Sequence, residues 1–219
     1  MILYHGSGVI IEKPLYGYGK PHNDYGQGFY CTQDMELAKE WACQDTDGGF
    51  VNTYELDDSG LKVLDLSVCN PVSWIALLLS NRIVRYSSPL EKKAAAYLKE
   101  HFLPDTTGYD LLTGYRADDS YFTYARAFLA NTISAQQLQS ALRLGNLGIQ
   151  VCLKSRESFN AIRFMEAVPV DGETYYPKYI QRDDQAREAY YRLLEQDPAD
   201  GLYVRDIIRK EMCADDLCL

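Results

Sequence analysis

The chain has 219 residues and a net charge of −9, with 47% hydrophobic and 24% charged residues, the balance of an ordinary soluble protein. This length fits one domain, or one domain with an added terminal element, and it can bury a core without disulfide or metal support. Because affinity for nucleic acid depends mainly on Lys and Arg, the acidic balance argues against a general nucleic-acid-binding protein.

The N-terminal segment MILYHGSGVI lacks the basic stretch and long apolar run of a secretory signal peptide. The longest apolar stretch, Trp74 to Leu79, is too short to span a bilayer. The six cysteines form no CxxC pair and no Cys/His cluster with zinc-ligand spacing. We therefore expect a cytoplasmic protein with reduced thiols, without a metal and without membrane contact.

The first half of the chain predicts strands separated by a long loop. Residues 1–5 form a buried strand that stops at Gly6-Ser7, and residues 8–27 form a loop rich in Gly, Pro, Tyr and Asn. A loop of this length in a compact domain is typical of a binding loop. A second strand follows at 28–32, and Asp34 caps a helix over 35–44. Residues 50–56 and 61–66 predict a hairpin across the turn 57–60.

The second half alternates helices and strands before it becomes wholly helical. Helices are predicted at 71–82, 89–101, 121–131 and 134–144, strands at 109–114, 148–154 and 165–170, and a short helix or turn at 158–164. After Asp171 the segments 177–196 and 202–212 are helical, charged and rich in tyrosine. We predict an α+β unit over residues 1–171, with a C-terminal helical extension over 172–219 packed on it.

One arrangement near the N-terminus favours a ligand site. GxGxxG, Walker A, HExxH and GxSxG motifs are absent from the sequence, and among its three histidines only His5 lies at a strand end beside a glycine. Gly6 lets a ligand approach the backbone closely, and the imidazole can donate to a sugar hydroxyl. Tyr30 supplies an aromatic face, and Trp41 follows eleven residues later on the next helix. Two rings with a backbone amide between them suit a flat aromatic carboxamide.

The segments LYHGS, YGQGFYCT and ELAKEWA resemble the H-Y-E branch of the ADP-ribosyltransferase superfamily, which includes diphtheria toxin and the poly-ADP-ribose polymerases. The chain is more similar still to a family of short bacterial ADP-ribosyltransferase-like proteins, through VNTYEL, YDLLTG with RADD, and GIQV. This resemblance covers about residues 1–170. It implies split antiparallel β-sheets that form an NAD cleft and are flanked by helices.

The resemblance also implies a role for each site residue. His5 would hold the adenosine-side ribose, Gly6 would grip the nicotinamide amide, and Tyr30 and Trp41 would sandwich the nicotinamide ring. Gln150 falls where the family usually has a catalytic glutamate that holds the 2′-hydroxyl of the nicotinamide ribose. Glutamine can hydrogen-bond this hydroxyl but carries no charge to stabilise developing positive charge. The implied catalytic set is Gln150, His5 and Tyr30, and the implied NAD-binding set is His5, Gly6, Ser7, Gly28, Tyr30 and Trp41.

The resemblance implies a mono-ADP-ribosyltransferase that cleaves NAD at the nicotinamide glycosidic bond and needs no metal. The acceptor would be an unidentified protein or nucleic acid, and stand-alone bacterial members of this kind resemble toxins or phage-defence components with an antitoxin-like protein partner. A catalytically degenerate NAD- or protein-binding module and an NAD glycohydrolase are the alternatives.

Several polar residues have open interpretations. A charged segment follows a predicted strand end and forms either a solvated turn or a functional loop: Arg116, Asp118 and Asp119. On the strand at 50–56, Asn52 and Glu55 point either to the cleft or away from it.

Overall fold

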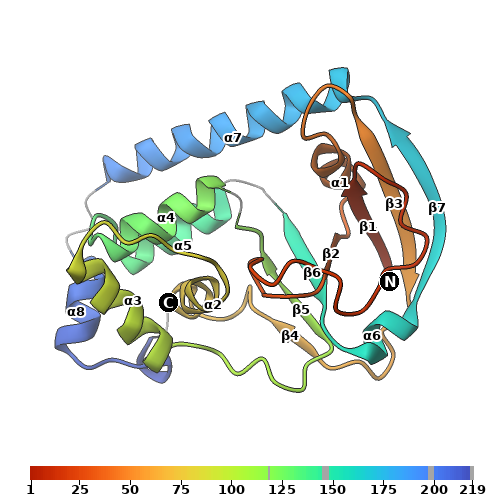
Figure 1. Cartoon of the computed structure of the whole chain (residues 1–219). Coiled ribbons are helices and arrows are strands. Elements are labelled where there is room, and N and C mark those ends of the chain that lie inside the picture. The colour runs from red at the N-terminus through yellow and green to blue at the C-terminus, as the bar shows by residue number, and fades with distance from the viewer. Residues whose placement is uncertain (118, 145–147, 197–199, 218–219) are drawn as a thin grey trace.

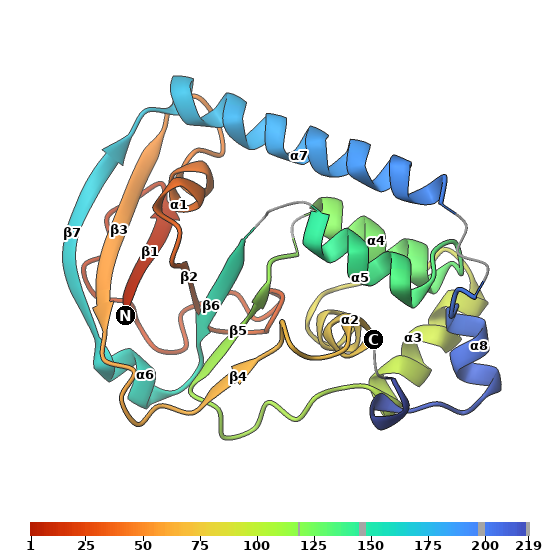
Figure 2. The ribbon, with the colours of Figure 1, turned by 180° about the vertical axis from the view of Figure 1, so that it is seen from behind.

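The structure is a computed structural model of the chain that describes residues 1–117, 119–144, 148–196 and 200–217, with only the backbone described at 119–121, 143 and 144. These residues form seven strands and eight α-helices, so the predicted α+β class is confirmed. Figures 1 and 2 show the sheet at one side of the molecule and most helices gathered at the other. Within the described ranges, no helix has both the length and the apolar character needed to cross a bilayer.

The seven strands are hydrogen-bonded into one sheet with the order β4-β5-β6-β2-β1-β3-β7. Neighbouring strands run antiparallel, except that β4 and β5 are parallel. The strands are β1 (Ile2–Ser7), β2 (Phe29–Thr32), β3 (Gly49–Leu56), β4 (Val63–Asp65), β5 (Leu111–Tyr115), β6 (Ile149–Leu153) and β7 (Ile162–Val170).

The sheet is weakly joined between β1 and β2. Within the described part of the chain, these two strands share one register pair, Tyr4 with Thr32, whereas β1 pairs with β3 along its whole length from Ile2 to Ser7. Figure 1 shows β1, β3 and β7 diverging from β2, β6, β5 and β4. We call this junction the seam. The expected split sheets are therefore one hydrogen-bonded sheet with a nearly open junction.

The helices pack in two places. α1 (Met35–Ala42) lies on β1 and β3, and it begins where the Asp34 side chain accepts hydrogen bonds from two backbone N–H groups of its first turn. A helical layer packs beside β4 and β5 (Figure 2). It contains α2 (Pro71–Asn81), α3 (Pro89–His101), α4 (Asp119–Leu129), α5 (Ala135–Leu144) and α8 (Val204–Arg209). The short α6 (Arg156–Ala161) leads directly into β7.

The centre of this helical layer is α2, because nine consecutive residues, Pro71 to Leu79, are buried. A helix that is apolar on all sides must be surrounded by other elements. The Asn70 side chain caps the helix by accepting from the Ser73 N–H, and Pro71 supplies a favourable first position. Trp74, fully buried on this helix, belongs to the main hydrophobic core.

The long helix α7 (Gly172–Leu194) runs from the end of β7 to the helical layer, as both views show. About halfway along α7, Arg182 donates to both carboxylate oxygens of Glu40 on α1, at 2.6 and 2.7 Å. Further along, Ala186 is buried, and Leu193 belongs to the main hydrophobic core, as do Val204 and Ile207 of α8. The helices after residue 171 thus share the core of the preceding residues, and whether 171 is a domain boundary stays a prediction.

The predicted hairpin between residues 50–56 and 61–66 is wrong. β3 has β1 on one side and β7 on the other, so neither of its edges is available to the next strand. Residues Val63–Asp65 pair instead in parallel with β5 on the far side of the sheet. The short helix and the last strand also begin earlier than predicted, at Arg156 and Ile162.

Candidate functional site

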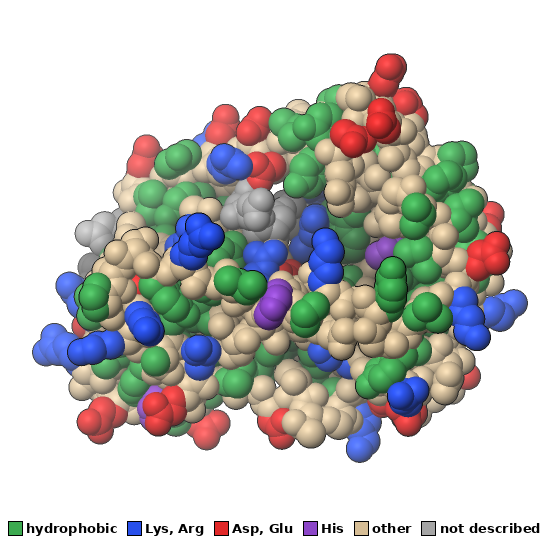
Figure 3. All heavy atoms as spheres, in the orientation of Figure 1, with side chains coloured by type: hydrophobic (Ala, Val, Ile, Leu, Met, Phe, Trp, Pro, Cys, Tyr) green, Lys and Arg blue, Asp and Glu red, His purple; other side chains and the backbone are tan. Residues whose placement is uncertain are grey.

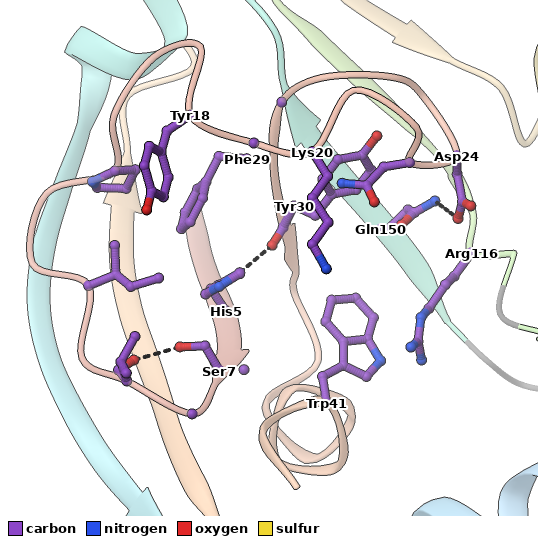
Figure 4. A pocket seen from close by; sticks show the side chains of 18 of the residues that line it. His5, Ser7, Tyr18, Lys20, Asp24, Phe29, Tyr30, Trp41, Arg116 and Gln150 are labelled. Carbon is purple, nitrogen blue, oxygen red and sulfur yellow. Dashed lines mark hydrogen bonds between the residues drawn. The ribbon is translucent and has the colours of Figure 1, made fainter. Parts of the chain in front are cut away.

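A cavity of about 800 Å³ lies beside the seam, between the end of β1, β2, α1 and β6. The loop that joins β1 to β2, residues 8–28 and here called the N-terminal loop, forms much of its wall (Figure 4). Sites for small organic ligands have volumes of about 300–1,000 Å³. Every residue predicted for the NAD site lines this cavity: His5, Gly6, Ser7, Gly28, Tyr30, Trp41 and Gln150.

The His5 ring crosses the seam. Its Nδ1 lies 2.6 Å from the carbonyl oxygen of Tyr30 on β2, and its ring centroid lies 4.5 Å from that of Phe29. Since a carbonyl only accepts, Nδ1–H is the donor. Burial lowers the pKa of His5, partly opposed by the hydrogen bond to Tyr30. The neutral ring therefore presents Nε2 as an acceptor, so a ligand hydroxyl would donate to it. In this tautomer His5 would accept a hydrogen bond from a sugar hydroxyl rather than donate one, and its role in ligand binding stays a prediction.

Two glycines allow the backbones around the cavity to approach closely. A Cβ on Gly6 would lie 2.0 Å from the carbonyl oxygen of Ala38, so only glycine lets α1 pack this tightly on β1. A Cβ on Gly28 would lie 2.4 Å from Cys152 Sγ and 2.6 Å from the Leu153 carbonyl oxygen. Packing alone thus requires a glycine at both positions, and each also leaves its backbone bare at the cavity wall.

Tyr30 and Lys154 hold one end of the N-terminal loop. The Tyr30 hydroxyl donates to the Gly26 carbonyl at 2.6 Å and accepts from the Tyr25 N–H at 3.0 Å. Lys154 Nζ donates to the carbonyls of Tyr25 and Gln27 at 2.6 and 2.8 Å. The Tyr30 hydroxyl is therefore occupied by the loop, and burial raises its pKa, which leaves the ring face as the part that a ligand can contact.

Asn52 on β3 holds the other end of the loop. This fully buried amide donates to Ser7 Oγ at 3.1 Å and to the Val9 carbonyl at 3.2 Å, and it accepts from the Ile11 N–H at 2.8 Å. The Ser7 hydroxyl in turn donates to the Val9 carbonyl. Asn52 is thus an anchor of the loop rather than a cavity residue, and the Ser7 hydroxyl is already engaged.

Trp41 packs against a positive charge in the cavity wall. The Arg116 guanidinium carbon lies 4.7 Å from the centre of the Trp41 ring, a cation–π geometry. The Trp41 indole N–H is buried, and the described residues offer it no hydrogen-bond partner. An unsatisfied buried donor costs roughly 1–3 kcal/mol, so a ligand acceptor at this position would be favoured. Figure 4 shows Trp41 and Arg116 facing one another, with Lys20 above them.

Gln150 is buried on β6, and its amide nitrogen is fully engaged. Nε2 lies 3.0 Å from Asp24 Oδ2 and 3.2 Å from the Tyr115 carbonyl oxygen. An amide nitrogen has two N–H donors, and these two acceptors use both. In this arrangement Gln150 has no N–H to offer a ribose hydroxyl.

Charged side chains of mostly one sign surround the cavity, although the whole chain is acidic. Figure 3 shows Lys and Arg side chains gathered around a hollow near the centre of this face. The lining includes Lys13, Lys20, Arg82 and Arg116, against Asp24 as the one acidic side chain among the described lining residues. Such a wall attracts anions. In the described ranges, no group of three or more His, Cys, Asp and Glu side chains is arranged to hold a metal ion.

The remaining sequence candidates lie in different places. Glu55 is exposed and pairs with Arg163, outside the cavity lining. Arg116 lines the cavity, Asp119 begins α4 with its side chain not described, and Asp118 lies outside the described residues.

Sequence reasoning missed Asp24, Lys20 and Arg82, which belong to the same cavity. Asp24 lies in the Asn23-Asp24-Tyr25-Gly26 run, which has the composition of an ordinary turn. Arg82 ends a helix, where a cation is favoured by the helix dipole alone. Neither residue had a sequence signal that separated it from these common roles. Tyr179 of α7 also lines the cavity, so the C-terminal extension contributes to its wall.

Comparison with curated proteins and with solved structures finds no match. The sequence model of one protein family matches residues 1–164, from β1 into β7, and its match ends before α7. This span includes the seam, the N-terminal loop and every predicted site residue. The chain therefore belongs to the family described as "Protein of unknown function (DUF3990)".

Proposed function

We propose that this protein binds NAD in the cavity and transfers its ADP-ribose to a macromolecular acceptor, a protein or a nucleic acid. The observation that carries the proposal is a convergence. Residues from four separate elements, selected by family resemblance, line one cavity: His5 and Gly6 from β1, Tyr30 from β2, Trp41 from α1 and Gln150 from β6. The open seam is compatible with the split-sheet cleft of an ADP-ribosyltransferase-like fold, which is part of the proposal.

The lining groups fit the parts of NAD. The nicotinamide ring would lie between Tyr30 and Trp41, with its amide on the Gly6 backbone. The adenosine-side ribose would donate a hydroxyl hydrogen to Nε2 of His5, which the Nδ1–Tyr30 hydrogen bond leaves as an acceptor. The indole N–H of Trp41, which has no partner among the residues described, supports the presence of a polar ligand here.

The pyrophosphate is the part of NAD that the cavity charge favours. In Figure 4 Lys20 lies above Trp41 and Arg116 lies beside it, where both can approach a phosphate. Arg116 now covers a face of the Trp41 ring, so a nicotinamide ring that stacks there would displace the guanidinium from it. The displaced side chain would then be available to the phosphates, because arginine binds phosphate through paired N–H donors.

The proposed reaction exchanges one glycosidic bond for another. The bond between ribose C1′ and the nicotinamide ring nitrogen breaks, and its electron pair stays with that nitrogen, so the cationic ring leaves as neutral nicotinamide. A lone pair of the acceptor forms the new bond to C1′, and the acceptor releases its proton to water. Positive charge develops on the ribose in the transition state, so the site must stabilise it electrostatically.

A binding module without turnover is the second candidate. It is favoured by Gln150, which carries no charge and whose amide nitrogen is used by Asp24 and the Tyr115 carbonyl. Such a module would bind NAD, or a protein partner such as an antitoxin-like inhibitor, through the same cavity.

One assay separates these functions. The protein is incubated with NAD labelled in the ADP-ribose, with and without a cell extract as the source of acceptor. Release of nicotinamide with label on macromolecules supports the transferase, and release of nicotinamide with free labelled ADP-ribose supports a glycohydrolase. A melting temperature raised by NAD, with no release, supports the binding module.

The site assignment is tested by NAD-induced thermal stabilisation in variants. His5→Ala and Trp41→Ala should abolish the NAD-dependent rise in melting temperature. His101→Ala, which removes an exposed histidine outside the cavity lining, should keep it. Full stabilisation of both cavity variants by NAD would refute the assignment.

A further inference from the structure

The cavity contains a buried carboxylate, and it does not lie at position 150, where the ADP-ribosyltransferase resemblance implies a glutamate. Asp24, on the N-terminal loop, has 6% exposure, and it is the one acidic side chain among the lining residues that the structure describes. Its Oδ2 lies 3.0 Å from Nε2 of Gln150, the residue that the resemblance to ADP-ribosyltransferases aligns with their catalytic glutamate. The site therefore has a carboxylate beside the residue that lacks one.

Among the described residues, every partner of this carboxylate is a donor. Arg82 Nε lies 3.0 Å from Oδ1, and Oδ2 accepts from the Ala117 N–H at 2.8 Å as well as from Gln150. Burial raises the pKa of Asp24, and Arg82 and the two hydrogen bonds oppose this rise. A carboxylate has about four lone-pair positions, so three partners leave it the capacity to accept one more hydrogen bond.

The geometry of Gln150 is that of a supporting residue. Its two N–H groups donate to Asp24 and to the Tyr115 carbonyl, which fixes the amide between the loop and β5. A buried side chain locked by two hydrogen bonds can orient a neighbour precisely because it cannot turn. We infer that Asp24 supplies the negative charge that stabilises the ribose during cleavage, and that Gln150 is a positioning residue that holds the Asp24 carboxylate.

This inference rests on the proposed function, since it names the charged group of the same NAD site. In this role Asp24 acts as a carboxylate, which Arg82 and the two hydrogen-bond donors favour, and it exchanges no proton, so its effect is electrostatic. The rival role for Asp24 is purely structural, because its carbonyl accepts from Asn81 Nδ2 and its carboxylate ties the loop to Arg82. The test must therefore measure charge rather than the presence of the side chain.

The two redox forms of the dinucleotide provide such a test. NAD has a cationic nicotinamide ring and NADH a neutral one, with nearly the same shape. Dissociation constants of both are measured by calorimetry for the wild-type protein and for Asp24→Asn, which keeps size and one acceptor oxygen. If the charge matters, Asp24→Asn should raise the dissociation constant for NAD by roughly three- to tenfold more than it raises the dissociation constant for NADH. Equal losses for the two would overturn it in favour of the structural role.

Turnover gives a second readout. Asp24→Asn should lower the rate of nicotinamide release by about 10²-fold, the usual effect of losing an electrostatic stabiliser. Gln150→Glu should lower it as well, because two buried carboxylates 3.0 Å apart cannot both ionise. A Gln150→Glu variant that is faster than wild type would show that position 150 is where the charge is needed, and would overturn the inference.

The double variant Asp24→Asn with Gln150→Glu exchanges the two groups and conserves the charge. It should recover part of the selectivity for NAD over NADH that the single Asp24→Asn variant loses. A double variant no better than Asp24→Asn contradicts the charge inference, provided that both have the same melting temperature. If the wild-type protein binds neither nucleotide, the proposed function itself fails. If the wild-type protein binds NAD and Asp24→Asn binds it equally well, only the inference about Asp24 fails.

Discussion

The two walls of the cavity are built in different ways. His5, Tyr30 and Gln150 lie on strands, and the register of β1, β2 and β6 sets their positions. Lys13, Lys20 and Asp24 lie on the N-terminal loop, which has no ladder of its own and is held by side chains from other elements: Asn52, Tyr30, Asn81, Arg82 and Lys154.

As a result, the rigid wall is mostly uncharged, and the charged groups lie on the loop. The strand wall presents the uncharged groups that would orient a ligand, whereas the loop wall presents two lysines and the carboxylate. Loops carry function where a rigid scaffold places them. Here the loop is held by the side chains named above, which we call its tethers, rather than by pairing with a neighbouring strand. The comparison predicts that damage to the strand wall costs stability of the whole fold, while damage to a tether acts mainly on the loop.

The largest effect is expected at the contact between α1 and the strand wall. Gly6→Ala would bring a Cβ within 2.0 Å of the Ala38 carbonyl oxygen, so α1 must shift. We expect the free energy of unfolding to fall by about 3 kcal/mol, with loss of NAD binding. Chemical denaturation measures this.

Gly8→Ala is the matched control for Gly6→Ala. It lies two residues away, also lines the cavity, and has open space around its Cβ position. Its free energy of unfolding should change by less than about 0.5 kcal/mol. A Gly6→Ala variant as stable as Gly8→Ala would mean that α1 is not packed on β1 as described.

A smaller effect is expected when a tether of the loop is removed. Asn52→Ala deletes the amide that holds Ser7, Val9 and Ile11, and should lower the free energy of unfolding by about 2 kcal/mol. Limited proteolysis should cut the N-terminal loop of this variant sooner than that of the wild type.

The next residue on β3 is the control. The Thr53 hydroxyl is buried with no partner among the described residues, so Thr53→Val should raise the free energy of unfolding by about 1 kcal/mol. Proteolysis of the loop should stay as in the wild type. Equal cleavage of Asn52→Ala and Thr53→Val would show that Asn52 does not hold the loop.

The smallest effect is a pH dependence from His5. Its folded-state pKa is lowered by burial, so between the ordinary value near 6.5 and the lower folded value the unfolded chain binds more protons. The free energy of unfolding should therefore fall as the pH falls below about 6.5, by at most about 1.4 kcal/mol per pH unit. His5→Gln should lose this slope in urea titrations between pH 7 and 5, whereas His101→Gln should keep it.

The features of this protein that depend on local sequence pattern could be predicted from the sequence. The α+β class, the first strand and the helix that carries Trp41 follow from hydrophobic periodicity and from caps such as Asp34. The first strand was predicted to stop at His5 but continues to Ser7, because Gly6 and Ser7 pair with Val51 and Phe50 of β3. The roles of His5, Tyr30, Trp41 and Gln150 stay predictions, although these residues line one cavity.

Features that depend on contacts between residues far apart in the sequence could not be predicted. The expected hairpin failed because β3 is paired on both edges, by a strand before it and by one that comes a hundred residues after it. Asp24 has the local signature of a turn residue, and it becomes part of the cavity only because Arg82, Ala117 and Gln150 converge on it in space. No window of the sequence contains those partners together.

The protein has two tryptophans, and the fold gives them opposite surroundings. Trp74 is completely enclosed in the core, with its indole N–H bonded to the Tyr115 carbonyl at 3.2 Å. Trp41 lines the cavity. Indole emission from a single solution thus contains a constant reference and a signal that responds to occupancy, without any attached dye. Trp41→Phe removes the responsive component and leaves the emission of Trp74 as the baseline.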